Sequence, residues 1–227
     1  MGLIMDPSRL SYTLDPNFNK LVIHAFSKLY HERLIYKGKK MINWDVKLQT
    51  AISDLEVIHK AEKNKLYYFK YYLVENKEKY LAVATSRPET IFTDACLFVN
   101  PADSRYTKYI GKKIINPLTR KEIPVLADES VLIDFGTGVL KCTPAHDFHD
   151  YELGIKYNLN CEVCLDPKGY LNELAGKYKG LERFAARKKI VEDLQENDIC
   201  FQIEIYESNI SYSQRSNVVV EPYLSTQ

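Results

Sequence analysis

The segment from Lys141 to Asp150 (KCTPAHDFHD) brings together more side-chain types capable of chemistry than any other stretch of the chain. It contains a cation, a hydroxyl, two imidazoles and two carboxylates within ten positions. The spacing of Asp147 and Asp150 places both carboxylates near one face of an expected helix, next to Lys141 and Thr143 at the end of an expected strand. Such a pocket can hold an ammonium group and orient a water molecule. Each residue alone is typical of a capped helix N-terminus with solvated acids, but together they favour a functional site.

A second polar segment, Thr85 to Thr90 (TSRPET), follows one expected strand and opens an expected helical turn. Backbone N–H groups and hydroxyls exposed at such a junction bind anionic or carbonyl oxygens. Arg87 adds a fixed positive charge. Taken by itself, the segment is better interpreted as an ordinary strand-to-helix junction with Pro88 as the first helical residue.

Two patterns resemble metal sites, and we interpret neither as one. The pairs His146-Asp147 and His149-Asp150 lack an obvious third and fourth ligand elsewhere in the sequence. Cys161-Glu162-Val163-Cys164 is a lone CxxC without a matching pair, and in a strand its two cysteines would face opposite sides of a sheet. The sequence therefore predicts buried strand cysteines and no metal, with a metal-dependent phosphohydrolase as a remote alternative.

Three helices are expected to frame these segments. Apolar periodicity predicts the first from Asp15, which can cap it, through Pro16 in its first turn to Gly38 at its end. A second helix should begin near Pro144, and a third should run from Leu181 to Glu196.

The rest of the chain reads mostly as β-structure. A hairpin is predicted from Leu66 to Val74 and Tyr80 to Thr85, across Glu75 to Lys79. Other short strands are predicted at Met41 to Trp44, Ala51 to Ile58, near Ile114, Ile123 to Leu126, Val131 to Ile133, Val139 to Thr143 and Ile199 to Tyr206. Short strands this closely spaced are typical of a barrel or a folded sheet. The predicted fold class is therefore α+β, a β-barrel-like domain with peripheral helices and an N-terminal flank of helix and short strands.

Composition excludes several classes of protein. The chain has 227 residues, of which 45% are hydrophobic and 27% charged, which suits one large domain or a domain with a smaller companion. A formal charge of +1 argues neither for nor against a nucleic-acid partner. Five cysteines, an odd number, fit a reducing cytosol, and there is no apolar run long enough for a membrane span and no export or lipid-anchor signal. We expect a cytoplasmic monomer that does not bind membranes.

Both polar segments match the signatures of one family. The chain resembles the editing domain, connective peptide 1, of class I aminoacyl-tRNA synthetases, and most closely that of the valine enzyme. Thr85 to Thr90 is similar to the family's T-T-R-P-E-T, and Phe135 to Asp150 is similar to its F-G-T-G-A-V-K-I-T-P-A-H-D-x-x-D. The flanks, Asn43-Trp44, Ala51 to Val57 and Val220 to Ser225, agree as well, so the resemblance covers nearly the whole chain.

The same resemblance implies which enzyme and which parts are present. The leucine enzyme shares P-A-H-D and the isoleucine enzyme has T-P-W-T, so Glu89, Lys141 and Thr143 favour valine. The signatures H-I-G-H and K-M-S-K-S of the ligation site are absent, so ATP is expected only at the synthetic site of a parent enzyme. We predict a flank over residues 1–60, an editing domain over 61–205, and a return segment toward the parent catalytic domain over 206–227.

The implied activity is post-transfer editing, in which water hydrolyses the ester of threonine wrongly attached to the 3′ acceptor end of tRNA(Val). A second site is needed because threonine and valine are nearly isosteric and a synthetic pocket rejects threonine only weakly. The resemblance implies that Asp150 binds the α-ammonium group, and that Asp147, Lys141 and Thr143 recognise the threonine hydroxyl. The remaining implied site residues are Thr90 and Arg87 against the ester or terminal adenosine, Phe135 as a wall of the side-chain pocket, and Thr85 and Ser86 at the binding segment. Asp150, Thr90 and Lys141 are the predicted catalytic set, and no cofactor is needed.

Departures from the family pattern leave this set intact. Many relatives have N-W-C-P-R-C where this chain has Asn43 to Leu48 (NWDVKL), which removes two thiolates and predicts no zinc. Ser86 replaces a threonine but keeps the hydroxyl. Two alternatives stay open: an editing domain of the leucyl or isoleucyl type, and a module that binds the tRNA acceptor end but is inactive in isolation.

Overall fold

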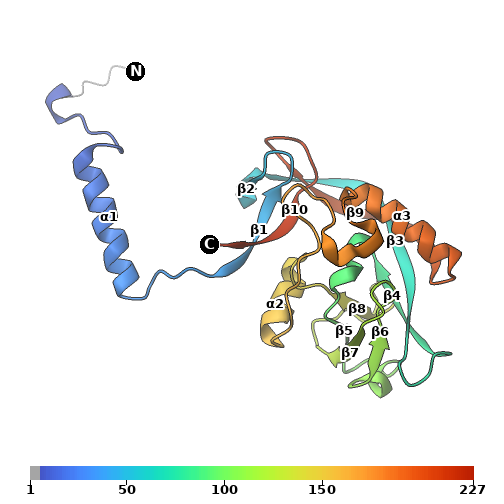
Figure 1. The fold of residues 1–227 in the computed structure, drawn as a ribbon. Coiled ribbons are helices and arrows are strands. Elements are labelled where there is room, and N and C mark those ends of the chain that lie inside the picture. Colours follow the sequence, from blue (N-terminus) through green and yellow to red (C-terminus); the bar gives the residue numbers. More distant parts are fainter. Residues whose placement is uncertain (1–5) are drawn as a thin grey trace. The chain divides into compact units, whose positions relative to one another are not determined.

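The computed structural model describes residues 6–227, which form two compact units (Figure 1). One unit comprises the chain up to residue 40 together with 226–227, and the other comprises residues 41–225. The predicted boundaries at 60/61 and 205/206 fall inside continuous strands, so the division into flank, editing domain and return segment stays a prediction about the parent protein. No helix within residues 6–227 has the length and apolar character needed to cross a membrane.

The first unit contains the short helix η1 (Pro7–Arg9) and helix α1 (Pro16–His31). Asp15 occupies the N-cap position and Pro16 the first turn, as predicted. The helix ends at His31, so the predicted end at Gly38 was wrong. The reason is local: the Arg33 amide donates to Tyr30 O and the Leu34 amide to Leu29 O, both at 3.0 Å, which closes a Schellman motif with Arg33 at φ 60°.

The second unit is built on three sheets. Strands β1 (Lys39–Asp45), β2 (Thr50–Ile52) and β10 (Glu221–Thr226) form a sheet of order β10-β1-β2. Strands β3 (Val57–Tyr72), β4 (Tyr80–Thr85) and β9 (Cys200–Ser213) form the sheet β4-β3-β9. Strands β5 (Cys96–Val99), β6 (Lys113–Ile115), β7 (Glu122–Ala127) and β8 (Val139–Cys142) form the sheet β6-β7-β5-β8. The fold is therefore mixed α+β, as predicted, but over the described residues the sheets do not close on themselves and the barrel-like arrangement is not confirmed.

Helices pack around these sheets at the points where strands end. They are α2 (Phe148–Lys156), α3 (Arg183–Glu196) and the short helices η2 (Asp54–Glu56), η3 (Pro88–Thr93), η4 (Thr107–Tyr109) and η5 (Glu173–Tyr178). The third helix is confirmed, and it begins where the Glu182 carboxylate accepts hydrogen bonds from the first-turn amides. The second begins at Phe148 instead of near Pro144, because Asp147 caps it. The hairpin is also confirmed, with Tyr72 opposite Tyr80.

Several strand predictions were wrong or incomplete. Residues 131–133 do not form a strand, because the chain turns just before them: the Asp128 carboxylate accepts from the Ser130 amide and Asp128 O from the Val131 amide. Cys161 and Cys164 do not lie in a strand. The predicted strand 51–58 is divided by the capping box of η2. Strands β5 and β10 were missed, as were the long extensions of β3 and β9.

The main core lies between the β4-β3-β9 sheet, the β6-β7-β5 strands and α3. It is formed by side chains such as Phe69, Tyr71, Val83 and Ile190, each fully buried. A smaller apolar cluster lies under α2 and contains Cys96, Phe98, Val131, Cys142 and Leu153. These two cores fix the ends of β4 and β8, which carry the two polar segments.

Candidate functional site

The fold brings the two polar segments together around one cavity. Segment 85–90 runs from the end of β4 into η3, and segment 141–150 runs from β8 into α2. A cavity of about 230 Å³ lies between them. Its lining includes all nine predicted site residues: Thr85, Ser86, Arg87, Thr90, Phe135, Lys141, Thr143, Asp147 and Asp150. Their placement in one cavity is a finding, while their individual roles stay predictions.

Lys141 is the hydrogen-bonding centre of the cavity floor. Its Nζ donates to Thr90 Oγ1 at 2.9 Å, to Thr143 Oγ1 at 3.2 Å and to Asp94 Oδ1 at 3.3 Å. The residue is 6% exposed, so this ammonium group is held by protein groups on several sides. Three contacts account for the three protons of the ammonium group.

Asp94 does not line the cavity itself but holds Lys141 in place, and its role was not predicted from the sequence. It follows η3 and accepts a hydrogen bond of 2.6 Å from the buried Tyr71 hydroxyl. Burial raises its pKa to about 6, although Lys141 and the Tyr71 hydroxyl act in the opposite direction. The only sequence signal was an acidic residue just before the apolar run 96–99, and nothing local connected it to Lys141.

Asp150 lies on the first turn of α2 with its carboxylate turned toward the end of β8. Its Oδ2 accepts from the Thr143 amide at 2.8 Å and from the Thr143 hydroxyl at 3.1 Å. Burial raises the pKa of Asp150, and the nearby Asp147 carboxylate raises it further. The carboxylate is thus ordered by neutral donors inside a low-dielectric site.

Asp147 has a different role from its neighbour. It is the N-cap of α2, and its Oδ1 accepts from the His149 amide at 2.9 Å and from the Asp150 amide at 3.2 Å. Asp147 therefore lies just before the helix instead of on its face. The prediction that Asp147 and Asp150 share one face of the helix was wrong for Asp147. The cap fixes where Asp150 points.

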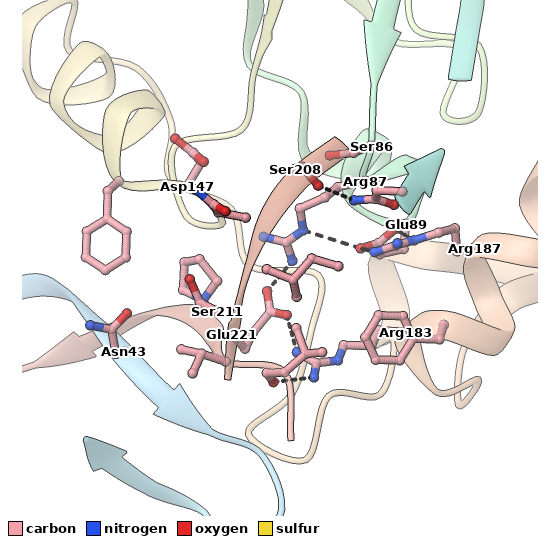
Figure 2. A pocket seen from close by; sticks show the side chains of 18 of the residues that line it. Asn43, Ser86, Arg87, Glu89, Asp147, Arg183, Arg187, Ser208, Ser211 and Glu221 are labelled. Carbon is pink, nitrogen blue, oxygen red and sulfur yellow. Dashed lines mark hydrogen bonds and ion pairs between the residues drawn. The ribbon is translucent and has the colours of Figure 1, made fainter. Parts of the chain in front are cut away.

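Arg87 is surrounded by acids instead of facing open solvent. Arg87, Glu89, Arg187, Glu221 and Arg183 form a row of ion pairs, which we name the arginine–glutamate chain (Figure 2). It borders a second cavity of about 380 Å³ that also has Ser86 and Asp147 in its lining. The contact of Arg87 with an ester or adenosine stays a prediction. The ion pairs of Arg87 with Glu89 and Glu221 were not predicted from the sequence.

Phe135 and Cys142 differ in exposure and in their neighbours. Phe135 is 57% exposed and lines both the polar cavity and an apolar pocket of about 320 Å³ with Ala84, Leu140 and His149. Cys142 instead faces the smaller apolar cluster, as strand alternation predicts. A side-chain hydrogen bond between the Cys142 and Cys96 thiols, together with burial, raises the pKa of Cys142.

The two imidazoles of segment 141–150 have separate neighbours. His146 Nε2 accepts from the Cys164 amide at 3.0 Å, whereas His149 Nε2 lies 3.2 Å from the Ser130 hydroxyl. Within residues 6–227, no group of three or more His, Cys, Asp or Glu side chains is placed to hold a metal ion. The absence of zinc and of other cofactors stays a prediction.

The comparison with known families decides the membership of the chain. The model of the tRNA synthetases class I (I, L, M and V) matches residues 1–222. The chain belongs to this family. It is 52% identical over 227 residues to a valine--tRNA ligase of Mycoplasma mycoides subsp. mycoides, 48% identical over 228 residues to one of Mesoplasma florum, and 47% identical over 227 residues to one of Staphylococcus aureus.

The chain is only a part of such a synthetase. Each of these matches covers 100% of this chain and 26% of the relative, so the chain spans about a quarter of the length of the curated ligases it matches. Among solved structures, a LeuRS of Agrobacterium radiobacter K84 in a ternary complex with tRNA and LeuAMS has a TM-score of 0.46 and 17% identity, over 87% of this chain and 33% of that chain. The family model and the matching ligases confirm the resemblance to class I synthetases at the level of the family.

Proposed function

We propose that the chain carries the editing site of a valine--tRNA ligase and hydrolyses the ester of threonine attached to tRNA(Val). The observation that supports this most directly is the shared cavity of about 230 Å³, in which segments 85–90 and 141–150 meet. Its polar floor contains one cation, Lys141, and a carboxylate, Asp150, that is ordered by the neutral donors of Thr143. The valine--tRNA ligases among its relatives support the choice of parent enzyme.

The geometry suggests how the ester is placed. The α-ammonium group of the substrate binds the Asp150 carboxylate, which has no fixed positive charge bonded to its Oδ2 in the structure. The threonine hydroxyl is recognised by Thr143, Lys141 and Asp147. A site that satisfies this hydroxyl discriminates against valine, because valine would leave these buried polar groups unpaired.

Water is the nucleophile in this proposal. It attacks the ester carbonyl carbon, the bond between that carbon and the ribose oxygen breaks, and the ribose oxygen takes up a proton as free threonine leaves. In this proposal, Thr90 and Arg87 position the ester or the terminal adenosine. No covalent intermediate on the protein and no cofactor is required.

The remaining parts of the proposal concern the parent protein. Its ATP-dependent synthetic site lies outside this chain, its macromolecular partner is the 3′ acceptor end of tRNA(Val), and it works as a monomer in the cytoplasm. The chain is not expected to activate an amino acid.

Deacylation of preformed threonyl-tRNA(Val) by the 227-residue chain tests the proposal. Valyl-tRNA(Val) is the substrate control, Asp150→Ala is the site variant, and Asp198→Asn is a matched variant that removes an exposed carboxylate paired with Lys70. Selective release of threonine that is lost in Asp150→Ala and kept in Asp198→Asn is the expected result. The reaction should also survive dialysis against a chelator.

Each alternative predicts a different result. A binding module that is inactive in isolation would bind the acceptor end but release no threonine at any protein concentration. An editing site of the leucyl or isoleucyl type would leave threonyl-tRNA(Val) intact and act on the noncognate products of those enzymes. A metal-dependent phosphohydrolase would lose activity to the chelator.

A further inference from the structure

Glu221, the first residue of β10, joins Arg87 to Arg183 within the arginine–glutamate chain (Figure 2). Only 2% of this residue is exposed. Its Oε1 accepts from Arg87 Nη2, and its Oε2 accepts from Arg183 Nη1 at 2.6 Å. Arg183 is fixed in turn by a hydrogen bond of 2.6 Å from its Nη2 to Val219 O. The carboxylate is therefore held on both oxygens by guanidinium groups.

Arg87 carries this restraint into both polar segments. Its Nη1 donates to His146 O at 2.6 Å, and the His146 amide closes a turn on Thr143 O at 2.9 Å, so the guanidinium holds the turn between β8 and α2. The backbone carbonyl of Arg87 accepts from the Thr90 hydroxyl at 3.0 Å and from the Thr90 amide at 3.1 Å. One side chain thus sets the spacing between segment 85–90 and segment 141–150.

His146 reinforces the same turn. Because its Nε2 accepts from the Cys164 amide, the ring proton is on Nδ1 when the ring is neutral, and Nδ1 lies 3.9 Å from Glu221 Oε1. Burial lowers the pKa of His146. The His146 ring and the Arg87 guanidinium therefore both lie against Glu221, and the His146 carbonyl is held by the same guanidinium.

The residues of the arginine–glutamate chain are charged near neutral pH, so the restraint on Arg87 holds there. Burial opposes ionisation of Glu221, but the charges of Arg87 and Arg183 lower its pKa below the usual value. Glu89 holds the Nε side of Arg87 at 3.3 Å and pairs with Arg187 at 2.7 Å. With acids on two sides, the Arg87 guanidinium has one favourable orientation, with Nη1 on His146 O.

We propose that Glu221 is a positioning residue for the cavity: it acts through Arg87 to fix the turn that presents Thr143 and Asp150 opposite Thr90. Its effect on catalysis rests on the proposed function, whereas its effect on the geometry of the cavity does not. Glu221 lies outside residues 61–205, so the predicted editing domain depends on a carboxylate from the return segment. A chain cut before Glu221 would keep every cavity residue but lose the group that orders them.

Amide hydrogen exchange of the 227-residue chain tests this without requiring activity. The Thr143 amide donates to Asp150 Oδ2 and reports directly on the turn, and the Val83 amide, in a fully buried part of β4, reports on the core. Glu221→Gln removes the charge at nearly constant volume. Asp193→Asn is the matched control, because Asp193 is a buried acid paired with Lys177 and the Tyr178 hydroxyl and does not line the cavity.

Glu221→Gln should raise exchange at Thr143 relative to Val83 about tenfold, and Asp193→Asn should change this ratio less than about twofold. A ratio that changes equally in both variants would overturn the proposal. Should Glu221→Gln not fold, Glu221→Asp keeps the charge but shortens the reach to Arg87 and Arg183, and an unchanged ratio in that variant would equally overturn it.

Deacylation separates this proposal from the proposed function. In Glu221→Gln, kcat for threonyl-tRNA(Val) should fall at least about tenfold while KM changes less than about twofold, because ester and water are misplaced without loss of binding groups. A parallel fall in Asp193→Asn would show a structural effect only and would contradict positioning. An inactive unsubstituted chain that still shows the exchange difference would contradict the hydrolase and support the positioning role.

Discussion

Asp150 in the cavity and Glu221 in the arginine–glutamate chain are two buried carboxylates whose charges are compensated in opposite ways. The Oδ2 atom of Asp150 receives neutral donors from Thr143, and burial raises the pKa of this residue. Glu221 receives two guanidinium groups, which lower its pKa against the effect of burial. Both are almost fully removed from solvent, so the difference comes from their partners and not from their depth.

This difference separates a group that can still bind a ligand from one already engaged in structure. A buried carboxylate without a fixed counter-ion gains most from an incoming ammonium group, because the ligand supplies the missing charge. A carboxylate shared by two arginines has little left to offer a ligand, and its loss leaves cations buried without a partner. The cavity and the arginine–glutamate chain should therefore respond in opposite ways to loss of a carboxylate charge.

The largest effect on stability is expected from Glu89→Gln. Glu89 is fully buried, and its two oxygens accept from Arg187 at 2.7 and 2.9 Å. Removing this charge should lower the free energy of unfolding by about 3–5 kcal/mol, because Arg187 and Arg87 lose a buried counter-ion. Urea unfolding at pH 7 measures it. Glu122→Gln, which breaks the exposed pair with Lys113, should cost less than about 1 kcal/mol, and equal losses in the two variants would contradict the comparison.

Asp150→Asn should show the reverse pattern. Threonyl-tRNA(Val) deacylation should fall about 100-fold, or about 2.7 kcal/mol in the barrier, because the α-ammonium group loses its counter-ion. The free energy of unfolding at pH 7 should change by less than about 1 kcal/mol, since a raised pKa means that the ionised form is disfavoured in the folded state. A loss of stability as large as that of Glu89→Gln would show that Asp150 is a structural acid.

The pH dependence of stability should distinguish Asp94 from ordinary paired acids. Its pKa rises from an ordinary 3.8 to about 6 on folding, so the folded state binds more protons than the unfolded state between these values. The stability contributed by Asp94 is therefore present below about pH 4 and is lost as the pH rises through 6. The difference in unfolding free energy between the unsubstituted chain and Asp94→Asn should fall by on the order of 2 kcal/mol from pH 4 to pH 7.

Asp193→Asn provides the opposite sign as a control. Hydrogen bonds from Lys177 and Tyr178 lower the pKa of Asp193, so its contribution is present above pH 4 and is lost as the pH falls further. Asp94→Asn and Asp193→Asn should therefore change the stability curve in opposite directions. The same sign in both would show that Lys141 outweighs burial at Asp94.

Local signals in the sequence were enough to predict the segments of the site but not their support. Segment 85–90 and segment 141–150 are each continuous, and capping residues and apolar periodicity placed them at strand-to-helix junctions. Asp94 and Glu221 were missed because their partners are distant in the chain: Lys141 lies 47 positions from Asp94 and Arg87 lies 134 positions from Glu221. Only the fold brings such charges together.

The errors in the fold have similar physical causes. Strand β5 was missed because all four of its residues are buried, so it shows no alternation of polar and apolar side chains. Gly38 was taken as the end of α1 because glycine is the usual residue at a left-handed C-terminal position, whereas Arg33 adopts that conformation. The barrel was inferred from strand spacing, which does not determine how sheets close.

The smallest effect is expected from Cys142→Ala, which tests whether a protein nucleophile takes part. Cys142 follows Lys141 directly, but its thiol packs beside Cys96 and Leu153 and its Sγ donates to Asp150 O at 3.6 Å. A side-chain hydrogen bond with the Cys96 thiol and burial raise its pKa, so the reactive thiolate is scarce at neutral pH. Deacylation by Cys142→Ala should stay within about threefold of the unsubstituted rate, the range that a small repacking of the nearby Asp150 turn allows.

A loss comparable to that of Asp150→Asn would instead assign the thiol to the reaction, and trapping of a threonyl thioester would then be expected. Because strand alternation places Cys142 and Lys141 on opposite faces of β8, a large effect would require the strand to rotate, and the Lys141 contacts with Thr90 and Thr143 oppose that rotation.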